Sequence, residues 1–238
     1  MQRKEQLAID IKDLSKTYIS GEVAVVALKN INIQIRRGER IVILGPSGAG
    51  KTTLLNLIGG ITSPDKNTKF LKIFGSNIQD YSVKKLSYYR KTRIGFIFQF
   101  YNLFPTLNAI DNVIIAIELL KDKKKKDVNL YEIAQSYLEK VGLGHRINHF
   151  PSQLSGGEQQ RVAIARALAR IPLIGKDFIL LCDEPTGNLD TDTGNKIIEL
   201  IGEINQNEGI TCLIVTHNPN IAQKLATDVI RIKDGMIE

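Results

Sequence analysis

The distribution of hydrophobic residues predicts two kinds of β-strand. Three short runs are almost entirely apolar, at Ile41–Leu44, Phe178–Cys182 and Ile210–Thr216. Such runs are typical of strands that are covered on both faces, as in parallel sheets. Within residues 27–36, Ile31, Ile33 and Ile35 instead alternate with polar side chains. That alternation predicts a half-buried strand of an antiparallel region.

Segments with helical periodicity alternate with the apolar runs. Helices are expected from Lys51 to about Gly59 and over 110–120, 129–141, 193–206 and 219–226, with further strands over 7–12, 69–74 and 94–99 and a hairpin over 229–237. Apolar strands that alternate with helices favour an α/β fold with a parallel core sheet and right-handed crossovers. We expect a single domain, 1–238, with a catalytic core and an N-terminal antiparallel β subdomain in 1–99 and 161–238, and an inserted helical subdomain over 100–160.

A glycine-rich loop joins the first apolar run to the first helix. From Gly45 to Thr52 the chain reads G-x-x-x-x-G-K-T, in the strand–loop–helix context that this motif needs. Glycine lets successive N–H groups point at one anion, and the helix N-terminus adds its own N–H groups and dipole. Lys51 supplies a mobile charge for phosphates, and Thr52 a hydroxyl for Mg²⁺. A nucleotide di- or triphosphate is therefore expected to contact Gly45, Pro46, Ser47, Gly48, Ala49, Gly50, Lys51, Thr52 and Thr53.

Two other stretches carry candidate chemistry. In LSGGE, residues 154–158, Ser155 and Glu158 have the spacing of a capping box, and the two glycines leave the N–H groups of the helix open to an anion. Taken alone, a well-capped helix with a glycine turn explains this stretch equally well. Asp183 and Glu184 directly follow the second apolar run, at the strand end where open α/β sheets bind ligands. His217 ends the third run in the same way.

Composition is ordinary for a globular protein, and the net charge alone does not decide what the protein binds. The net charge is +7, and KDKKKK at 121–126 concentrates the excess. Without interleaved aromatic residues this run is expected to be a solvated loop, or a contact to anionic lipid headgroups. Cys182 and Cys212 lie inside apolar runs and are expected to be buried and reduced, which favours the cytosol. Neither a membrane span nor a secretory signal is expected.

The order of these motifs resembles the nucleotide-binding domain of ATP-binding cassette (ABC) transporters over nearly the whole chain. The resemblance rests on the phosphate loop, Gln99, the LSGGE segment, ILLCDE at 179–184, the LD of 189–190 and His217. The LSGGE segment distinguishes this family from other phosphate-loop proteins, which lack it. FIFQFYNLFPTLNAIDNV and DEPTGNLD are most similar to the lipoprotein-release, macrolide-export and cell-division ATPases. The linker at 172–177 is slightly long for the family.

The resemblance implies a phosphate-loop fold, a mainly parallel core sheet with helices on both faces, and roles for individual residues. Glu184 would orient and deprotonate the attacking water, and His217 would contact the γ-phosphate and hold Glu184 and the water. Lys51 and Gln99 complete the implied catalytic set. Because catalysis of phosphoryl transfer is mainly placement and charge neutralisation, these roles need little proton abstraction by Glu184.

The cofactors implied are ATP and Mg²⁺. Tyr18 falls where the family stacks an aromatic ring on adenine, although a lone tyrosine before a turn can equally be surface packing. Thr52 and Gln99 would be Mg²⁺ ligands, and Asp183 would hold water coordinated to the ion. Hard oxygen donors and few protein ligands suit Mg²⁺.

The resemblance also implies partners. The segment Leu154, Ser155, Gly156, Gly157, Glu158, together with Asp190, would contact ATP held by the phosphate loop of a second nucleotide-binding domain, most simply a second copy of this chain. A separate integral membrane permease is implied too, with Phe100, Tyr101 and Phe104 as candidate contacts. No nucleic-acid partner is expected.

The function implied is the ATP-hydrolysing subunit of an ABC transporter, of an export or lipoprotein-handling type, located in the cytoplasm and peripheral at the membrane through its permease. One alternative is a soluble ABC ATPase that acts in cell division, DNA repair or assembly. A second is a regulatory module that uses ATP only as a switch, against which intact Glu184 and His217 argue.

Overall fold

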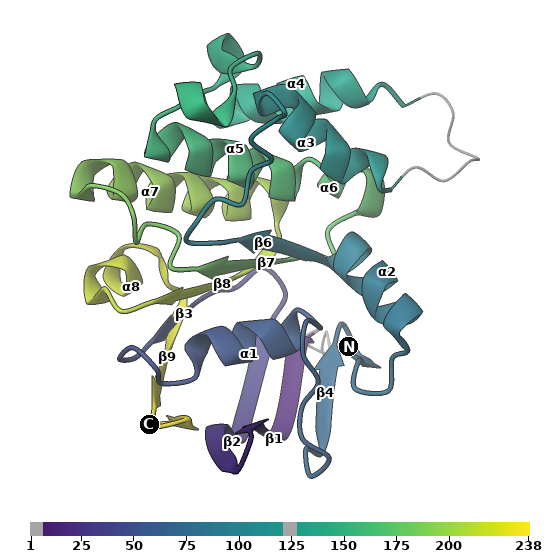
Figure 1. The fold of residues 1–238 in the computed structure, drawn as a ribbon, viewed down its shortest axis with the longest axis vertical. Helices are drawn as coiled ribbons and strands as arrows, with labels where there is room; N and C mark the ends of the chain where they lie inside the picture. Colours follow the sequence, from purple (N-terminus) through teal and green to yellow (C-terminus); the bar gives the residue numbers. More distant parts are fainter. Residues whose placement is uncertain (1–6, 121–127) are drawn as a thin grey trace, which may run out of the picture.

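The core of the protein is a six-stranded sheet with the order β10-β9-β3-β8-β7-β6. A computed structural model describes residues 7–120 and 128–238 (Figure 1). Five neighbouring core strands run parallel, and β10 is antiparallel to β9. The core strands are β3 (Arg40–Leu44), β6 (Ile94–Ile97), β7 (Ile179–Asp183), β8 (Thr211–Thr216), β9 (Asp228–Lys233) and β10 (Met236–Ile237).

A second sheet has four antiparallel strands in the order β2-β1-β4-β5. It is formed by β1 (Leu7–Ser20), β2 (Val23–Arg36), β4 (Phe70–Ile73) and β5 (Ser76–Asn77). The predicted first strand, 7–12, is too short. Its alternation breaks where the register shifts around Leu14, near Asp13 and Asn30, which have φ of 52° and 51°. The alternation of apolar and polar residues therefore ends at this point, although the strand continues.

Both faces of the core sheet are covered by helices, as predicted. On one face α1 (Lys51–Ile58) lies between the two sheets, where Leu54 and Leu57 pack with Ile43 and Leu213 (Figure 1). On the other face, Cys182 belongs to a second hydrophobic cluster, which the core strands share with the helices on that face. Successive side chains of one strand thus enter opposite hydrophobic clusters, which explains why the core strands lack polar alternation.

The helices on the second face come from the middle and the end of the chain. They are α3 (Ala109–Glu118), α4 (Leu130–Lys140), α5 (Gly156–Leu168), α7 (Thr191–Glu208) and α8 (Pro219–Leu225), with 3-10 turns at Gly144–Arg146 and Pro151–Gln153. α3, α4 and α5 pack on one another, and α5 also contacts β6 and α7 (Figure 1). The subdomain boundaries near 100 and 160 stay a prediction, and the basic run at 121–126 lies outside the described residues.

Two helices were not predicted. α2 (Val83–Arg93) begins at the N-cap Ser82 and has one buried side chain, Tyr89, whose hydroxyl donates to the carbonyl of Ile58 at 2.6 Å. It carries no apolar stripe, so periodicity could not reveal it. α6 (Ile171–Ile174) occupies part of the linker that is long for the family.

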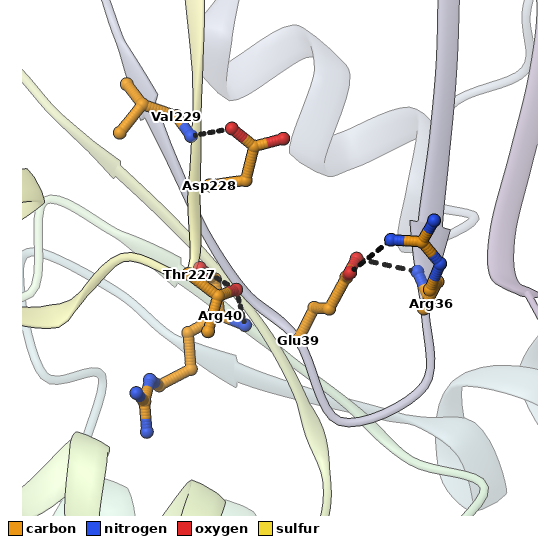
Figure 2. Close-up of polar contacts among 6 residues, drawn as sticks. All are labelled: Arg36, Glu39, Arg40, Thr227, Asp228 and Val229. Atoms are coloured by element: carbon orange, nitrogen blue, oxygen red, sulfur yellow. Dashed lines mark hydrogen bonds and ion pairs between the residues drawn. The ribbon is translucent and has the colours of Figure 1, made fainter.

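Hydrogen bonds hold the beginning of β3 next to the beginning of β9 (Figure 2). The backbone N–H of Arg36 and its guanidinium donate to the carboxylate of Glu39 at 2.8 and 3.2 Å, which closes the turn between β2 and β3. Arg40 then exchanges two bonds of 2.9 Å with the hydroxyl of Thr227. These contacts fix where β3 starts, and its five residues then carry the chain to the phosphate loop.

Within residues 7–120 and 128–238, no helix is both long enough and apolar enough to cross a membrane.

Candidate functional site

The phosphate loop, residues 45–53, is packed tightly against the backbone of two strands, β2 and β9. A Cβ atom on Gly50 would lie 2.3 Å from the carbonyl oxygen of Ala27, and one on Gly45 would lie 2.1 Å from that of Ile232. Gly50 also has φ of 99°, which disfavours any other residue. Packing therefore requires glycine at both positions, and the loop conformation requires it at Gly50 as well.

Lys51 starts α1 and points back over the loop. Its ammonium group donates to the carbonyls of Gly45 and Pro46 at 2.8 Å each, and the side chain is buried. Gly48, with φ of 79°, has open space around its Cβ position. Only conformation, and not packing, therefore requires glycine at this tip of the loop.

A cleft of about 390 Å³ lies over the loop. Residues 47–53 form one wall, and Tyr18 of β1 lines the cleft with Val25 and Val26 of β2. Tyr18 is 41% exposed, so its ring is accessible from the cleft. Sequence reasoning named Tyr18 but missed the two valines, whose exposure on a strand edge gives no pattern to detect. Gly45 and Pro46, the first two residues of the loop, are not among the described residues that line the cleft.

Oxygen atoms gather at the far side of the cleft. The hydroxyl of Thr52 donates to the carboxylate of Asp183 at 3.1 Å, and Gln99 lines the cleft beside them. Burial raises the pKa of the Asp183 carboxyl, and the charge of Glu184 adds to this, while the Thr52 bond opposes it. A hydroxyl, an amide and a carboxylate thus converge where the sequence predicted hard oxygen ligands.

Glu184 lines this cleft and forms a hydrogen-bonded pair with His217, which is not among the described residues that line it. Nδ1 of His217 lies 2.9 Å from Oε1 of Glu184. Glu184 has φ of 46°, an uncommon conformation for a non-glycine residue. Its N–H donates to the carbonyl of Val215 and its carbonyl accepts from Gly187, both at 3.0 Å. These backbone bonds hold the turn in a strained conformation in which the carboxylate contacts His217. Strained residues of this kind are common at functional sites.

The LSGGE segment forms the capped start of α5. The hydroxyl of Ser155 accepts from the N–H of Glu158 at 3.3 Å, and the Glu158 carboxylate accepts from the N–H of Ser155 at 2.8 Å. That backbone bond is the main reason that the pKa of Glu158 is lowered. The capping box predicted from the spacing is present.

The two glycines of the segment lie in close contact with neighbouring side chains. A Cβ on Gly157 would lie 2.4 Å from the methyl group of Thr193, and one on Gly156 would lie 2.7 Å from the hydroxyl of Tyr101. Asp190 caps α7 by accepting from the N–H groups of Asp192 and Thr193, and the bond from Thr193 is the main cause of its lowered pKa. Asp190 thus has a structural task within its own chain.

The structure brings one part of the predicted site together and leaves another apart. Within the described residues, neither the LSGGE segment nor Asp190 lines the cleft over the phosphate loop. Their assignment to the ATP of a second copy stays a prediction. Phe100 and Phe104 are 71% and 48% exposed, and Tyr101 is half-buried beside Gly156.

The chain was compared with known proteins on this basis. Residues 28–187 match the family model described as ABC transporter. The chain belongs to this family. The ABC family, the fold class and the ATPase assignment predicted from the sequence are thereby confirmed, and the dimeric ABC cassettes among the solved relatives agree with them.

Three relatives show how far the similarity extends. A lipoprotein-releasing system ATP-binding protein of Syntrophus aciditrophicus is 41% identical over 96% of this chain and 98% of its own length. A macrolide export ATP-binding/permease protein of Syntrophobacter fumaroxidans is 39% identical over 97% of this chain and 31% of its own length. A dimeric, post-hydrolysis ABC cassette of Methanocaldococcus jannaschii bound to ADP and Pi has a TM-score of 0.85 at 39% identity, over 97% of this chain and 96% of that chain.

Proposed function

We propose that this chain is the ATP-hydrolysing subunit of an ABC transporter of the lipoprotein-release or macrolide-export type. It pairs with a second copy around two ATP molecules and drives a separate membrane permease. The observation that carries the proposal is the hydrogen-bonded pair Glu184–His217, 2.9 Å apart, at the cleft that the phosphate loop also lines. A phosphate loop alone would fit many nucleotide-binding proteins.

The bound nucleotide is ATP with Mg²⁺. The N–H groups of the phosphate loop and the ammonium of Lys51 hold the phosphates, and Lys51 exchanges its bonds to two loop carbonyls for bonds to phosphate oxygens. Thr52 and Gln99 would hold Mg²⁺, and Asp183 would hold it through water. Their hydroxyl, amide and carboxylate oxygens are the donors that this ion prefers. The ion, when bound, neutralises charge on the phosphate oxygens.

The pair Glu184–His217 positions the attacking water. The carboxylate orients the water toward the γ-phosphate, and His217 fixes the carboxylate through the 2.9 Å contact. The side chain of Glu184 is 18% exposed and that of His217 is 70% exposed, so the histidine can reach a ligand in the open cleft. Placement of the water contributes more than proton abstraction, because an ordinary glutamate is a weak base.

The second half of each ATP site comes from the partner copy. The N–H groups at the start of α5, in the LSGGE segment, are open to an anion, and Asp190 lies at the start of α7 next to them. Two identical chains that face each other across a two-fold axis supply both halves twice. The dimeric cassette bound to ADP and Pi supports this arrangement.

The membrane partner contacts the exposed aromatic residues after β6. Phe100 and Phe104 are unusually exposed for their size, and Tyr101 lies between them and the LSGGE segment. The relative named as an ATP-binding/permease protein is about three times as long as the stretch it shares with this chain, which supports a permease partner. The chain would then be peripheral on the cytoplasmic face of the membrane.

The experiment that tests this function is the substitution Glu184→Gln. The variant is expected to bind ATP, to form a stable dimer in size-exclusion chromatography with ATP, and to hydrolyse ATP at least about a hundredfold more slowly. Glu199→Gln, an exposed glutamate of α7, is the matched control and is expected to hydrolyse ATP at the wild-type rate. Wild-type turnover by Glu184→Gln would refute the role of Glu184, and an ATP-bound monomer would refute the paired site.

A further inference from the structure

A buried amide on α5 contacts the turn that carries Glu184. Gln160 is fully buried, and its Nε2 donates to the carbonyl of Pro185 at 2.7 Å. In the described part of the chain, its Oε1 has no hydrogen-bond partner. Burial of an amide with half of its hydrogen-bonding capacity unused is unfavourable for folding. An aliphatic side chain would avoid this penalty, so the amide at this position indicates a task other than packing.

The carbonyl that Gln160 binds belongs to the residue directly after Glu184. The strained turn at Glu184 is otherwise held by the bond of its N–H to Val215 on β8 and by the bond of Gly187 back to its own carbonyl. The bond from Gln160 comes instead from a helix, α5. A shift of α5 relative to β7 and β8 therefore acts on the orientation of the Glu184 carboxylate.

The same helix begins with the LSGGE segment. Gln160 follows Ser155 by five positions, which is about 7.5 Å along a helix at 1.5 Å per residue. Gly156 and Gly157 at the helix start are packed against Tyr101 and Thr193 without room for a Cβ atom. A displacement at the capped end is therefore carried along a rigid helix to Gln160, and not absorbed in a loose contact.

We propose that Gln160 is a positioning residue that ties the orientation of Glu184 to the position of the LSGGE segment. The inference rests on the proposed function. In the dimer the LSGGE segment contacts the ATP of the partner, whereas Glu184 acts on the ATP of its own chain. Gln160 thus links the two sites: a nucleotide in one site moves α5, and α5 sets the water-orienting carboxylate of the other.

The first test removes the amide and keeps the volume. Gln160→Leu is expected to lower kcat for ATP about tenfold or more, because misplacement of a reacting group by a fraction of an ångström is enough for this. KM for ATP and ATP-dependent dimer formation are expected to stay within about twofold. A purely structural defect would not lower kcat while leaving KM and dimer formation unchanged. Gln160→Met, with a flexible side chain of similar length, repeats the test if the leucine variant does not fold.

Asn205→Leu is the matched control. Asn205 is also a buried amide, and it bonds to the carbonyls of Gly38 and Ile210 at the opposite end of β8. Its loss is expected to lower the thermal midpoint and to leave kcat within about twofold. An unchanged kcat in Gln160→Leu, or an equal loss of kcat in Asn205→Leu, would overturn the inference. So would an effect of Gln160→Leu on KM alone.

A double-mutant cycle with Ser155→Ala tests the link between the sites. If α5 carries the signal, Gln160→Leu lowers kcat by a smaller factor in the Ser155→Ala background than in the wild type. Equal factors would show that Gln160 acts on Glu184 without the LSGGE segment and would overturn the link. A wild-type chain without ATPase activity would instead refute the proposed function itself, so the two failures are distinguishable.

Discussion

The packing of Gly50 against β2 predicts a large and specific effect of one added methyl group. In Gly50→Ala the new Cβ would lie 2.3 Å from the carbonyl oxygen of Ala27 and 2.8 Å from a methyl carbon of Leu28, with φ at 99°. The methyl group cannot fit without movement of the phosphate loop away from β2. Stability and nucleotide binding should therefore be lost together.

The magnitude follows from two contributions. A non-glycine residue in this region of φ costs about 1–2 kcal/mol, and overpacking against backbone adds about 1–3 kcal/mol. Gly50→Ala is therefore expected to lower the free energy of unfolding by about 2–5 kcal/mol. Gly21→Ala is the matched control: φ there is 61°, and a Cβ would meet no atom within 4 Å. It should cost only about 1–2 kcal/mol.

The assay is urea unfolding of the nucleotide-free protein, followed by far-ultraviolet circular dichroism because the chain contains no tryptophan. Loss of unfolded-state entropy on Gly→Ala exchange is similar at both positions and cancels in the comparison. Equal destabilisation of Gly50→Ala and Gly21→Ala, within about 0.5 kcal/mol, would refute the steric argument. A Gly50→Ala variant that binds ATP like the wild type would show that nucleotide binding does not depend on the close packing of the loop against β2.

Two further substitutions test contacts of α5 and of the helix after it. Hydrogen bonds from Ser155 lower the pKa of Glu158 in the folded protein. The ionised carboxylate therefore stabilises the fold at pH values above about 4.3, the ordinary pKa of glutamate. This stabilisation is lost as the pH falls through the lower pKa of the folded protein. Glu158→Gln should be about 0.5 kcal/mol less stable than wild type at pH 7, with a gap that closes between about pH 5 and pH 2 in thermal unfolding; a constant gap would contradict this. Arg170 donates to the carbonyls of Lys91 and Ile94, and burial lowers its pKa to about 10, so it remains charged at pH 7. Arg170→Met should cost about 3 kcal/mol in urea unfolding, and Arg170→Lys less, since one ammonium cannot replace the planar fork of donors; equal stability of all three proteins would contradict the role of the guanidinium.

The sequence predicted those features that local pattern determines. The almost wholly apolar run at 178–182 predicted a strand covered on both faces, and the structure divides its residues between two hydrophobic clusters. The spacing of Ser155 and Glu158 predicted a capping box, and both of its hydrogen bonds are present. The glycine-rich loop required positive φ, and Gly48 and Gly50 supply it. In each case the physical cause acts over a few neighbouring residues.

The features that were missed depend on contacts between distant segments. α2 forms without an apolar stripe, because its single buried side chain, Tyr89, reaches the carbonyl of Ile58. β1 continues through a change of register that only its partner strand reveals. Gln160 lies among ordinary helix-forming residues, and nothing in that stretch shows that its amide meets Pro185, 25 positions away. Only the fold makes these contacts.

The candidate site depends on both kinds of information. Asp183 ends β7, Gln99 and His217 follow β6 and β8, and Thr52 lies in the first turn of α1 after β3. Parallel strands end at one edge of the sheet. Residue types at strand ends were therefore enough to predict which side chains meet. The contact of His217 with Glu184 was expected from the family resemblance, whereas the bond that joins the Glu184 turn to α5 is visible only in the structure. If α5 moves when the partner's nucleotide binds, that geometry makes Glu184, the residue proposed to orient the water, sensitive to a ligand that its own phosphate loop does not hold.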